Sequence, residues 1–372
     1  MTSIIYVGMD VHTTNYTLCC YSMEDDRFFA EVQVEPDAKN ILKYLARIEK
    51  QQSRDCRIVC GYEAGCLGYS LYHQLHAHGI DCVILAPTTM MTKPGKRIKT
   101  DRRDARLISK CLAFHTYSPV YIPTEVDDAV KEYIRMRDDA NSALARVKQQ
   151  IIAFCIRHGK IHDGKSYWRN KHLEWLSSLD LGNKILSEVL QEYLIRYYQL
   201  REQVDMYDMR INEIAQAEPY RQKVEKLGCF RGIAAHTALS FCVEVGDFRR
   251  FATAQQFASY FGLVPGECSS GDKQQYTGIT KAGNSHLRKL LVETAQVFGR
   301  SATKSGKSVA LKERQAKCDS LTVAYADKAN ARLKKKYFKI AMRSKVNIAK
   351  TAVAREMACF IWGMMTDNIS CA

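Results

Sequence analysis

Apolar runs and helical patterns alternate in a fixed order over the first 114 residues, and this order limits the folds open to the chain. Three strand-like runs come first, at residues 3–9, 16–22 and 28–34. Asp37 is then placed to cap a helix with apolar residues at helical spacing. A strand at 57–62, a helix at 65–79, a strand at 81–86 and a helix at 101–114, which Thr100 can cap, complete the series. This order predicts a mixed α/β domain over residues 1–120.

Two long helical repeats follow the prolines at positions 119 and 123. Apolar residues recur at steps of three and four from Val126 to Ile151, and again in a second helix expected at about 184–217. Helices of this length need a partner, from the same chain or another copy, to cover their apolar side. We therefore expect an antiparallel coiled coil over residues 121–220, with dimerisation as a natural hypothesis.

The remaining residues, 221–372, predict a mainly helical domain. Shorter helices are expected at 235–244, 254–261 and 285–301, followed by basic helices to the end. A loop rich in glycine and serine interrupts them from Val264 to Gly283, and such loops tend to carry chemistry. The expected fold class is α/β plus all-α, in three domains.

The formal net charge of +15 is concentrated near the C-terminus. Between His286 and Arg355 there are eighteen Lys or Arg and four Asp or Glu, a net +14. A charge run is often only a solvated helix face, but this density favours contacts with nucleic-acid phosphates. A basic helix on a membrane surface is an alternative. No long apolar segment or signal sequence accompanies the charge, so we expect no membrane association and a cytoplasmic location.

The chain has fourteen cysteines, scattered along its length. Without a signal peptide they are expected to be reduced. No CxxC pair with a matching second half is present, which argues against a zinc site. Most of these cysteines are therefore expected to be small core residues.

Four carboxylates stand at informative places in the predicted order. Asp10 closes the first strand, Glu63 follows the fourth, and Asp101 and Asp104 are three residues apart at the start of a helix, where they share a face. Attack on a phosphodiester puts negative charge on oxygens, which two divalent ions about 4 Å apart can stabilise. Oxygen ligands suit Mg²⁺, or Mn²⁺. The arrangement predicts a catalytic metal site.

Each acid also has a structural explanation. Asp101 and Asp104 would be favoured in a first helical turn by the helix dipole, and Glu63 could be a surface acid after a strand. The positions of all four together favour the metal site. His12 lies close to Asp10, but a lone histidine is usually neither a ligand nor a phosphate contact, so we leave it out of the predicted site.

The order of elements and acids resembles the ribonuclease H-like, or RuvC-like, fold of many nucleases and integrases. A more specific resemblance is to the DEDD transposases with an N-terminal RuvC-like domain, a family that includes the pilin-gene invertase Piv. The matching segments are residues 8–12 (GMDVH), 62–65 (YEAG), 99–106 (KTDRRDAR), 261–265 (FGLVP), 269–271 (SSG), 280–284 (TKAGN) and 287–288 (LR). They span nearly the whole chain.

This resemblance implies a nucleophile in the C-terminal domain. In the family the serine immediately before a glycine attacks DNA, which corresponds to Ser270, although spacing alone leaves Ser269 open. A serine can hold the DNA end as a phosphoserine ester and conserve bond energy for rejoining. Without the resemblance, Ser-Ser-Gly would be interpreted as a turn. Lys281 and Arg288, with Lys99 of the N-terminal basic loop, are candidate phosphate contacts.

The resemblance also implies donor and target DNA as partners, a non-coding guide RNA from the same mobile element, and a dimer or tetramer. Two other functions remain open from the residues. A metal-dependent nuclease acting on DNA junctions would need the carboxylates but no serine. An RNA-binding protein with an inactive nuclease fold would need neither.

Overall fold

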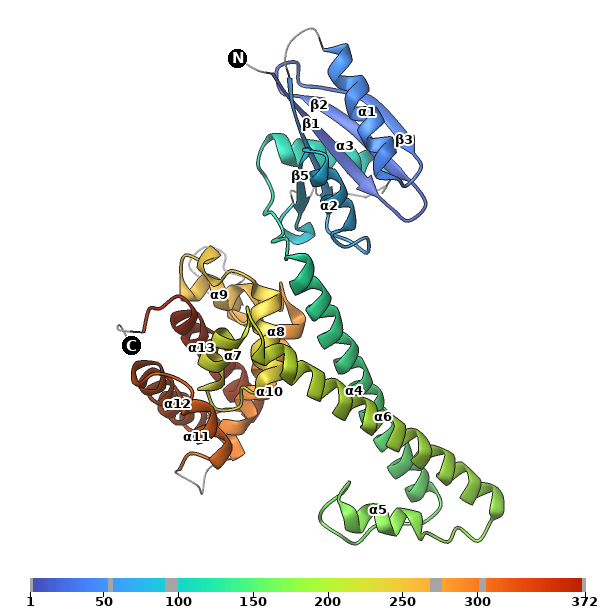
Figure 1. Cartoon of the computed structure of the whole chain (residues 1–372), viewed down its shortest axis with the longest axis vertical. Coiled ribbons are helices and arrows are strands. Elements are labelled where there is room, and N and C mark those ends of the chain that lie inside the picture. The colour runs from blue at the N-terminus through green and yellow to red at the C-terminus, as the bar shows by residue number, and fades with distance from the viewer. Residues whose placement is uncertain (1–2, 53–55, 91–99, 268–275, 301–305, 370–372) are drawn as a thin grey trace. The chain divides into compact units, whose positions relative to one another are not determined.

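A computed structural model describes residues 3–52, 56–90, 100–267, 276–300 and 306–369 of the chain. It divides into two compact units, Met1–Ile122 and Pro123–Ala372 (Figure 1). The division falls directly before Pro123, the second of the two prolines that separate the α/β pattern from the long helical repeats.

The first unit is an α/β domain, as its order of strands and helices predicts. Its elements are β1 (Ser3–Val11), β2 (Tyr16–Ser22), β3 (Arg27–Val34), α1 (Ala38–Gln51), β4 (Cys56–Glu63), α2 (Ser70–Ala77), β5 (Asp81–Leu85), the short 3₁₀ helix Pro87–Thr89 and α3 (Asp101–Ala113). Both expected caps are present, because Asp37 accepts from the backbone N–H of Lys39 and Thr100 accepts from that of Arg103.

The five strands form one mixed sheet in the order β3-β2-β1-β4-β5. β2 pairs antiparallel with both β1 and β3, whereas β4 runs parallel to β1 and to β5. This mixed sheet with three antiparallel strands at one side is consistent with the ribonuclease H-like arrangement.

The two faces of the sheet are covered by different helices. Alternate β1 residues Ile5, Val7 and Met9 are buried with residues of α1 and α2, while Tyr6 is buried with residues of α3. Helix α3 therefore covers the face that carries the even-numbered residues of β1.

The second unit is mostly helical. Its elements are α4 (Glu125–Arg157), α5 (Asn170–Ser177), α6 (Lys184–Gln216), α7 (Arg221–Gly228), α8 (Ala235–Val245), the 3₁₀ helix Phe248–Arg250, α9 (Ala254–Tyr260), β6 (Pro265–Glu267), β7 (Tyr276–Ile279), α10 (Ser285–Arg300), α11 (Val309–Gln315), α12 (Ser320–Ala341) and α13 (Val346–Met365). Most of these helices match the sequence prediction. Helices α5 and α7 were not predicted.

Helices α4 and α6, each of 33 residues, pack against each other in opposite directions. Ile134 near the start of α4 is buried with Ile211 near the end of α6, and Ile151 near the end of α4 is buried with Leu190 near the start of α6. The expected apolar repeats thus cover each other within one chain.

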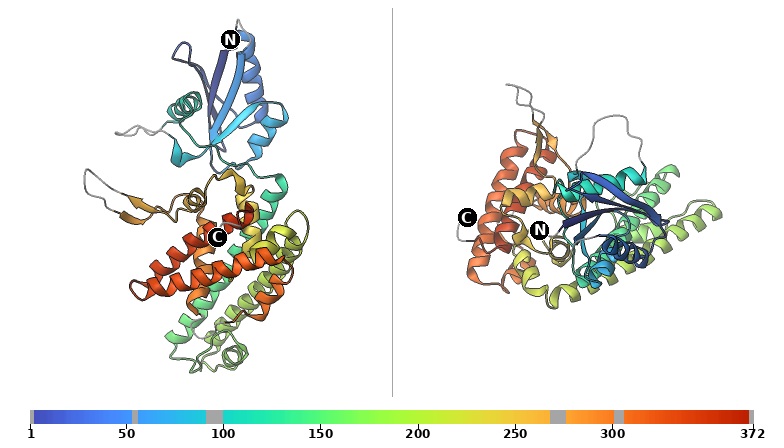
Figure 2. Two further views of the ribbon diagram at one scale, coloured as in Figure 1. Left: turned by 90° about the vertical axis from the view of Figure 1, so that its left-hand side faces the viewer. Right: turned by 90° about the horizontal axis from the view of Figure 1, so that it is seen from above.

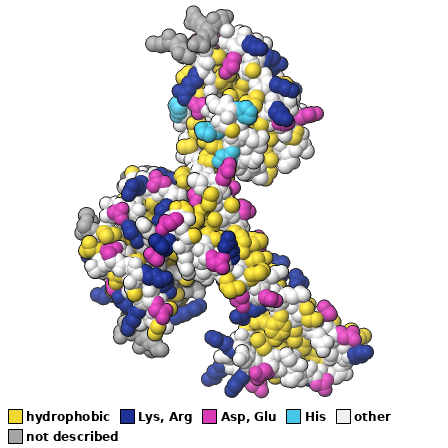
Figure 3. Space-filling view, viewed as in Figure 1, with side chains coloured by type: hydrophobic (Ala, Val, Ile, Leu, Met, Phe, Trp, Pro, Cys, Tyr) yellow, Lys and Arg dark blue, Asp and Glu magenta, His cyan; other side chains and the backbone are white. Residues whose placement is uncertain are grey.

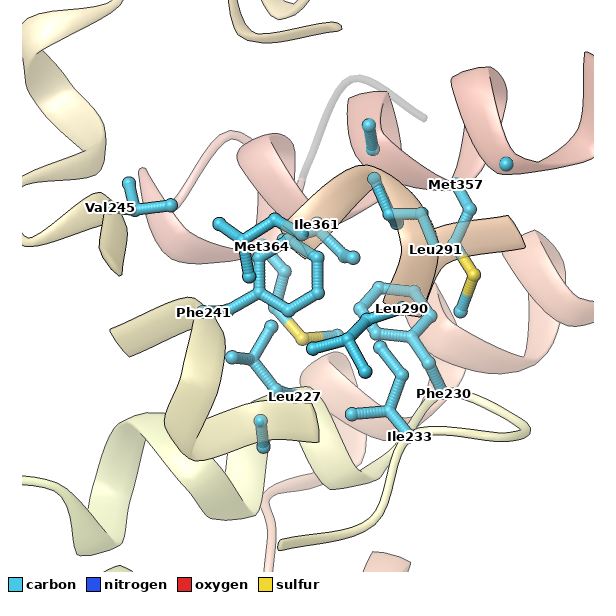
Figure 4. Packing of buried hydrophobic residues seen from close by; sticks show 14 of the residues in the cluster. Leu227, Phe230, Ile233, Phe241, Val245, Leu290, Leu291, Met357, Ile361 and Met364 are labelled. Atoms are coloured by element: carbon cyan, nitrogen blue, oxygen red, sulfur yellow. The ribbon is translucent and has the colours of Figure 1, made fainter. Parts of the chain in front are cut away.

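Most of the other helices surround one apolar core, whereas α5 packs with α4 and α6. Side chains of α7, α8, α10 and α13 meet in its centre, among them Leu227, Phe241, Leu291 and Ile361 (Figure 4). Burial of side chains of this size stabilises a fold by about 1.5–3 kcal/mol each. This core holds the first residues of α10 and the end of α8 in fixed relative positions.

The region from Val264 to Gly283, expected to be a loop, contains a short ribbon. Strands β6 and β7 pair antiparallel, with Pro265 opposite Ile279 and Glu267 opposite Tyr276. Figure 2 shows the ribbon projecting from the helices of this unit. Within the described part of the chain, no helix is both long and apolar enough to cross a membrane.

Candidate active site

Two of the predicted acids end neighbouring strands at one edge of the sheet. The parallel ladder between β1 and β4 pairs Met9 with Tyr62, and Asp10 and Glu63 are the next residues on each strand. Because side chains alternate along a strand, Asp10 lies on the same face as Tyr6 and Gly8, the face covered by α3. The Asp10 side chain is 15% exposed, whereas Glu63 is an exposed residue.

Helix α3 crosses this face in backbone contact with β1. A Cβ atom at Gly8 would lie 2.1 Å from the carbonyl oxygen of Ala105 and 2.4 Å from the backbone nitrogen of Ser109. A Cβ atom at Gly61, opposite Gly8 in the ladder, would lie 2.8 Å from Leu112. Because the contacts at Gly8 are to backbone atoms, this approach of the helix requires glycine there, whereas at Gly61 the contact is to the end of a leucine side chain.

This close crossing brings the first turn of α3 to Asp10. Asp101 and Asp104 are in that turn, three residues apart, directly after the Thr100 cap. Two basic residues of the same helix face elsewhere, because Arg102 and Arg106 form ion pairs with Glu31 at 3.3 and 2.6 Å.

The closest group at this edge consists of Asp10, Asp101 and His12. The His12 Nε2 atom lies 3.3 Å from Asp10 Oδ2 and 4.0 Å from Asp101 Oδ1. One ligand atom from each residue lies within 4.8 Å of those of the other two, close enough to share a metal ion. Asp104 and Glu63 stand outside this group of three.

His12 was left out of the predicted site, and the structure places it inside. Its position, two residues after Asp10 and just beyond the end of β1, was the available signal, because alternation brings such a residue back to the same side. A neutral imidazole could contribute a nitrogen ligand beside the oxygens, and a protonated one could contact a phosphate.

The electrostatics of the cluster fit a divalent cation. Burial, together with the neighbouring charges of Asp104 and Asp101, raises the pKa of the Asp10 carboxyl above its usual value, although His12 opposes the change. Several carboxylates thus repel one another at a half-buried edge. Hard oxygen ligands in this setting suit Mg²⁺ or Mn²⁺.

The candidate residues of the C-terminal half are only partly described. Ser269 and Ser270 lie outside the described residues, as does Lys99 of the N-terminal basic loop. Lys281 is exposed in the turn after β7, with a backbone φ of 57°. Arg288 donates to the carbonyl oxygens of Phe261 and Ala282 at 2.8 and 3.3 Å, so its guanidinium helps to hold that turn.

Comparisons with known families match both halves of the chain. Residues 7–156 match a DEDD-type family model described as Transposase, and residues 225–314 match the model described as Transposase IS116/IS110/IS902 family. The first match includes all four predicted acids. The second includes the ribbon and α10.

Individual relatives cover most of the chain. The "Putative transposase y4qE" of Sinorhizobium fredii is 35% identical over 307 residues, 82% of this chain and 75% of that protein. The transposase for insertion sequence element IS1533 of Leptospira borgpetersenii is 32% identical over 340 residues, 90% of this chain and 95% of the relative. Together with the two family matches, these relatives show that the chain belongs to the IS116/IS110/IS902 family of insertion-sequence transposases.

Proposed function

We propose that this transposase cuts and rejoins DNA strands through a phosphoserine intermediate at Ser270, assisted by a metal site formed by Asp10, Glu63, Asp101 and Asp104. The observation that carries the proposal is the meeting of Asp10 and Asp101 with His12 at the edge of the sheet, in a chain that belongs to a transposase family. The serine itself is assigned by the resemblance of residues 269–271 to the family motif.

The residues divide the chemistry between them. The Ser270 hydroxyl attacks phosphorus, so that an Oγ–P bond forms, the bond from phosphorus to the leaving deoxyribose oxygen breaks, and the serine proton is balanced by the proton gained by that oxygen. The acids hold a divalent cation, which when bound stabilises negative charge on the entering and leaving oxygens. Rejoining is the reverse reaction with a new deoxyribose hydroxyl.

Contacts with DNA are expected along α12 and α13, where many of the C-terminal cations lie. A groove with a volume of about 1230 Å³ runs beside these helices and the β6–β7 ribbon. Its lining includes the cations Arg332, Lys336 and Arg355 together with Phe360 and Trp362. Cations and aromatic rings side by side are typical of surfaces that bind nucleic-acid strands.

An oligomer and a guide RNA complete the proposal. The long helices carry exposed apolar side chains, which a second copy could cover: Ile156, Ile185, Val189, Ile195, Tyr198, Met206 and Met209. Figure 3 shows hydrophobic side chains gathered on the surface of this helical pair. The guide RNA is proposed from the family resemblance.

The deciding experiment compares Ser270→Ala with Ser269→Ala on DNA carrying the element's own ends. Ser270→Ala should abolish the covalent protein–DNA species, whereas Ser269→Ala should keep it, and mass spectrometry should locate the adduct on Ser270. Asp10→Ala should abolish cleavage, both in the native chain and in Ser269→Ala. Undiminished cleavage by Ser270→Ala would instead favour a metal-dependent junction nuclease, and tight RNA binding with no Mg²⁺-dependent cleavage would favour an inactive RNA-binding protein.

A further inference from the structure

A cluster of largely buried charged side chains lies in the second unit, and none of its members was among the residues predicted to carry chemistry. It joins Asp138 of α4, Glu244 of α8 and His286 of α10. The His286 Nε2 atom lies 2.7 Å from Asp138 Oδ2, and its Nδ1 atom lies 2.6 Å from Glu244 Oε1. The side chains of Asp138 and His286 are each 18% exposed, and that of Glu244 is 3% exposed.

The geometry fixes the protonation state of His286. An ionised carboxylate only accepts hydrogen bonds, so both ring nitrogens must donate, and a ring with two N–H groups is an imidazolium. Burial by itself lowers the pKa of His286, but the bonds to Asp138 and Glu244 outweigh it and raise the pKa to about 9. At neutral pH the cluster therefore contains a positive charge between two negative ones.

Further charged groups surround this centre. The titratable or charged side chains that face it from α4 and α8 are Asp138, Arg135, Arg137, Glu244 and His236. Arg137 lies 3.1 Å from Asp138 and also binds Asp208 of α6, while Arg135 lies 3.7 Å from Glu244. The nearby histidine, His236, lies 2.9 Å from Asp138.

The cluster is tied to the turn between β7 and α10. Asn284 donates from its side chain to Glu244 Oε2 at 2.5 Å and from its backbone to the carbonyl oxygen of Tyr260 at 3.0 Å. Its side-chain oxygen accepts from Leu287, which caps the first turn of α10. A Cβ atom at Gly283 would lie 2.1 Å from that same Tyr260 oxygen, so the turn packs directly against the backbone of Tyr260.

Lys281, in the middle of this turn, has a strained backbone. Its φ of 57° lies in the left-handed region that side chains other than glycine rarely adopt. Its N–H donates to the carbonyl oxygen of Gly262 at 3.1 Å, and the preceding Thr280 donates to that of Val264 at 3.0 Å. Such strain persists only where the surroundings hold it, and it is concentrated at binding sites.

We propose that the His286 imidazolium, held between Asp138 and Glu244, is a positioning residue that fixes the turn Thr280–Asn284 so that Lys281 meets a backbone phosphate of the DNA being joined. The inference rests on the proposed function in one respect, that the strand is joined in this unit. His286 acts through Asn284 and Lys281 and does not touch the DNA.

A double-mutant cycle tests this coupling. His286→Gln should slow strand joining on the order of 100-fold, because a small displacement of a positioning group has effects of that size. Lys281→Gln should weaken DNA binding roughly 10-fold and reduce the salt dependence of log Kd by about one unit. If His286 acts through Lys281, the double variant binds DNA no more weakly than Lys281→Gln alone. Fully additive losses would overturn the proposal.

A matched control separates positioning from general stability. His172 is also a buried histidine, in α5, with its Nδ1 atom accepting from the backbone of Trp168. His172→Gln should leave DNA affinity and its salt dependence unchanged. If His172→Gln and His286→Gln weaken DNA binding equally at matched thermal stability, the effect is not positioning and the proposal fails.

A titration of DNA affinity keeps the test usable if His286→Gln does not fold. Between pH 7 and 9.5, the affinity of the native chain should fall as His286 loses its proton, and Lys281→Arg should show the same fall, since arginine stays charged. Loss of the pH dependence in Lys281→Arg would show that the lysine itself titrates, against the proposal. All binding is measured in Ser270→Ala, so that a wrong nucleophile assignment leaves this result intact.

Discussion

Two clusters of acidic side chains, one in each unit, are built on opposite principles. At the sheet edge of the first unit, Asp10 and Asp101 lie close to His12, the charge of Asp104 is nearby, and burial raises the pKa of Asp10. In the second unit, Asp138 and Glu244 enclose His286 and receive arginines as well, and hydrogen bonds hold the pKa of both carboxyls below the usual range despite burial.

The difference indicates what each cluster requires. The cluster around His286 contains its own positive charge, so it is complete within the chain and fixes structure. The acids around Asp10 lack comparable compensation in the described residues, which supports the proposal that they hold an external cation. Both clusters contain buried charge, so burial does not distinguish a structural cluster from a cation site. The balance of positive and negative charge does.

The largest effect is expected from replacing one acid of the cluster around Asp10. Asp10→Asn should slow DNA cleavage on the order of 1,000-fold, the size of effect seen when one preorganised charge-stabilising group is removed. It should also remove the increase in melting temperature that Mg²⁺ gives the native chain, because binding to the folded state alone stabilises it. Differential scanning fluorimetry with and without Mg²⁺ measures the second effect.

Asp81→Asn is the matched control, because Asp81 begins β5 of the same sheet and pairs with Arg57 at 2.5 Å. It should keep both cleavage and the Mg²⁺ response. Two results would contradict the assignment of the metal site. One is a melting temperature of the native chain that does not change with Mg²⁺, and the other is a melting temperature of Asp10→Asn that still rises with Mg²⁺.

The cluster of Asp138, Glu244 and His286 should make the stability of the folded chain depend on pH. Because the pKa of His286 is raised from 6.5 to about 9, its contribution is complete below pH 6.5 and disappears as pH rises through 9. The pKa values of Asp138 and Glu244 are lowered from 3.8 and 4.5, so their contribution is complete above pH 4.5 and disappears at lower pH. The cluster therefore stabilises the folded chain most between pH 4.5 and 6.5.

Urea unfolding followed by tryptophan fluorescence measures this, since all three tryptophans (Trp168, Trp175 and Trp362) lie in the second unit. His286→Gln should lower the free energy of unfolding by about 3 kcal/mol at pH 6, the cost of leaving buried carboxylates without their partner. The loss should shrink towards pH 9.5. An equal loss at both pH values would show that His286 contributes packing and no charge.

A smaller effect is expected from the glycine beneath α3. Gly8→Ala places a methyl group against backbone atoms of Ala105 and Ser109, which should cost about 1–3 kcal/mol and displace the helix that carries Asp101 and Asp104. Gly65→Ala is the control, because its Cβ would lie 3.9 Å from the nearest atom, the carbonyl oxygen of Glu63. Hydrogen exchange of β1 and β4 measures stability, and Mg²⁺ affinity measures the displacement. Unchanged affinity in Gly8→Ala would show that the acids do not depend on this crossing.

Local patterns predicted the elements that depend on local physics. The caps at Asp37 and Thr100 and the starts of α3, α6, α8, α9 and α10 agree with the sequence prediction, because capping side chains and apolar spacing lie within a few residues of one another. Helices α5 and α7, of eight residues each, were missed. The strands β6 and β7, of three and four residues, depend on pairing across the residues between them.

The candidate sites show the same limit. The places of Asp10 and Glu63 near the ends of strands and of Asp101 and Asp104 in a first helical turn could be predicted, because such positions are visible in the sequence. His12 was missed, since a histidine near an acid has no periodic signal. His286 could not be predicted as a charged centre, because Asp138 is 148 residues away and Glu244 is 42 residues away. Only packing of α4, α8 and α10 brings them together.

Because Gly8 is in backbone contact with α3, Gly8 and Asp10 of the N-terminal motif are under different constraints. Asp10 is a residue that we propose to hold a cation, whereas Gly8 is needed because it has no side chain. When a mobile element decays and its enzyme is no longer selected for activity, substitutions at Asp10 cost the fold little. We expect decayed copies that still fold to lose the aspartate first and to retain the glycine for as long as the sheet and the helix remain together.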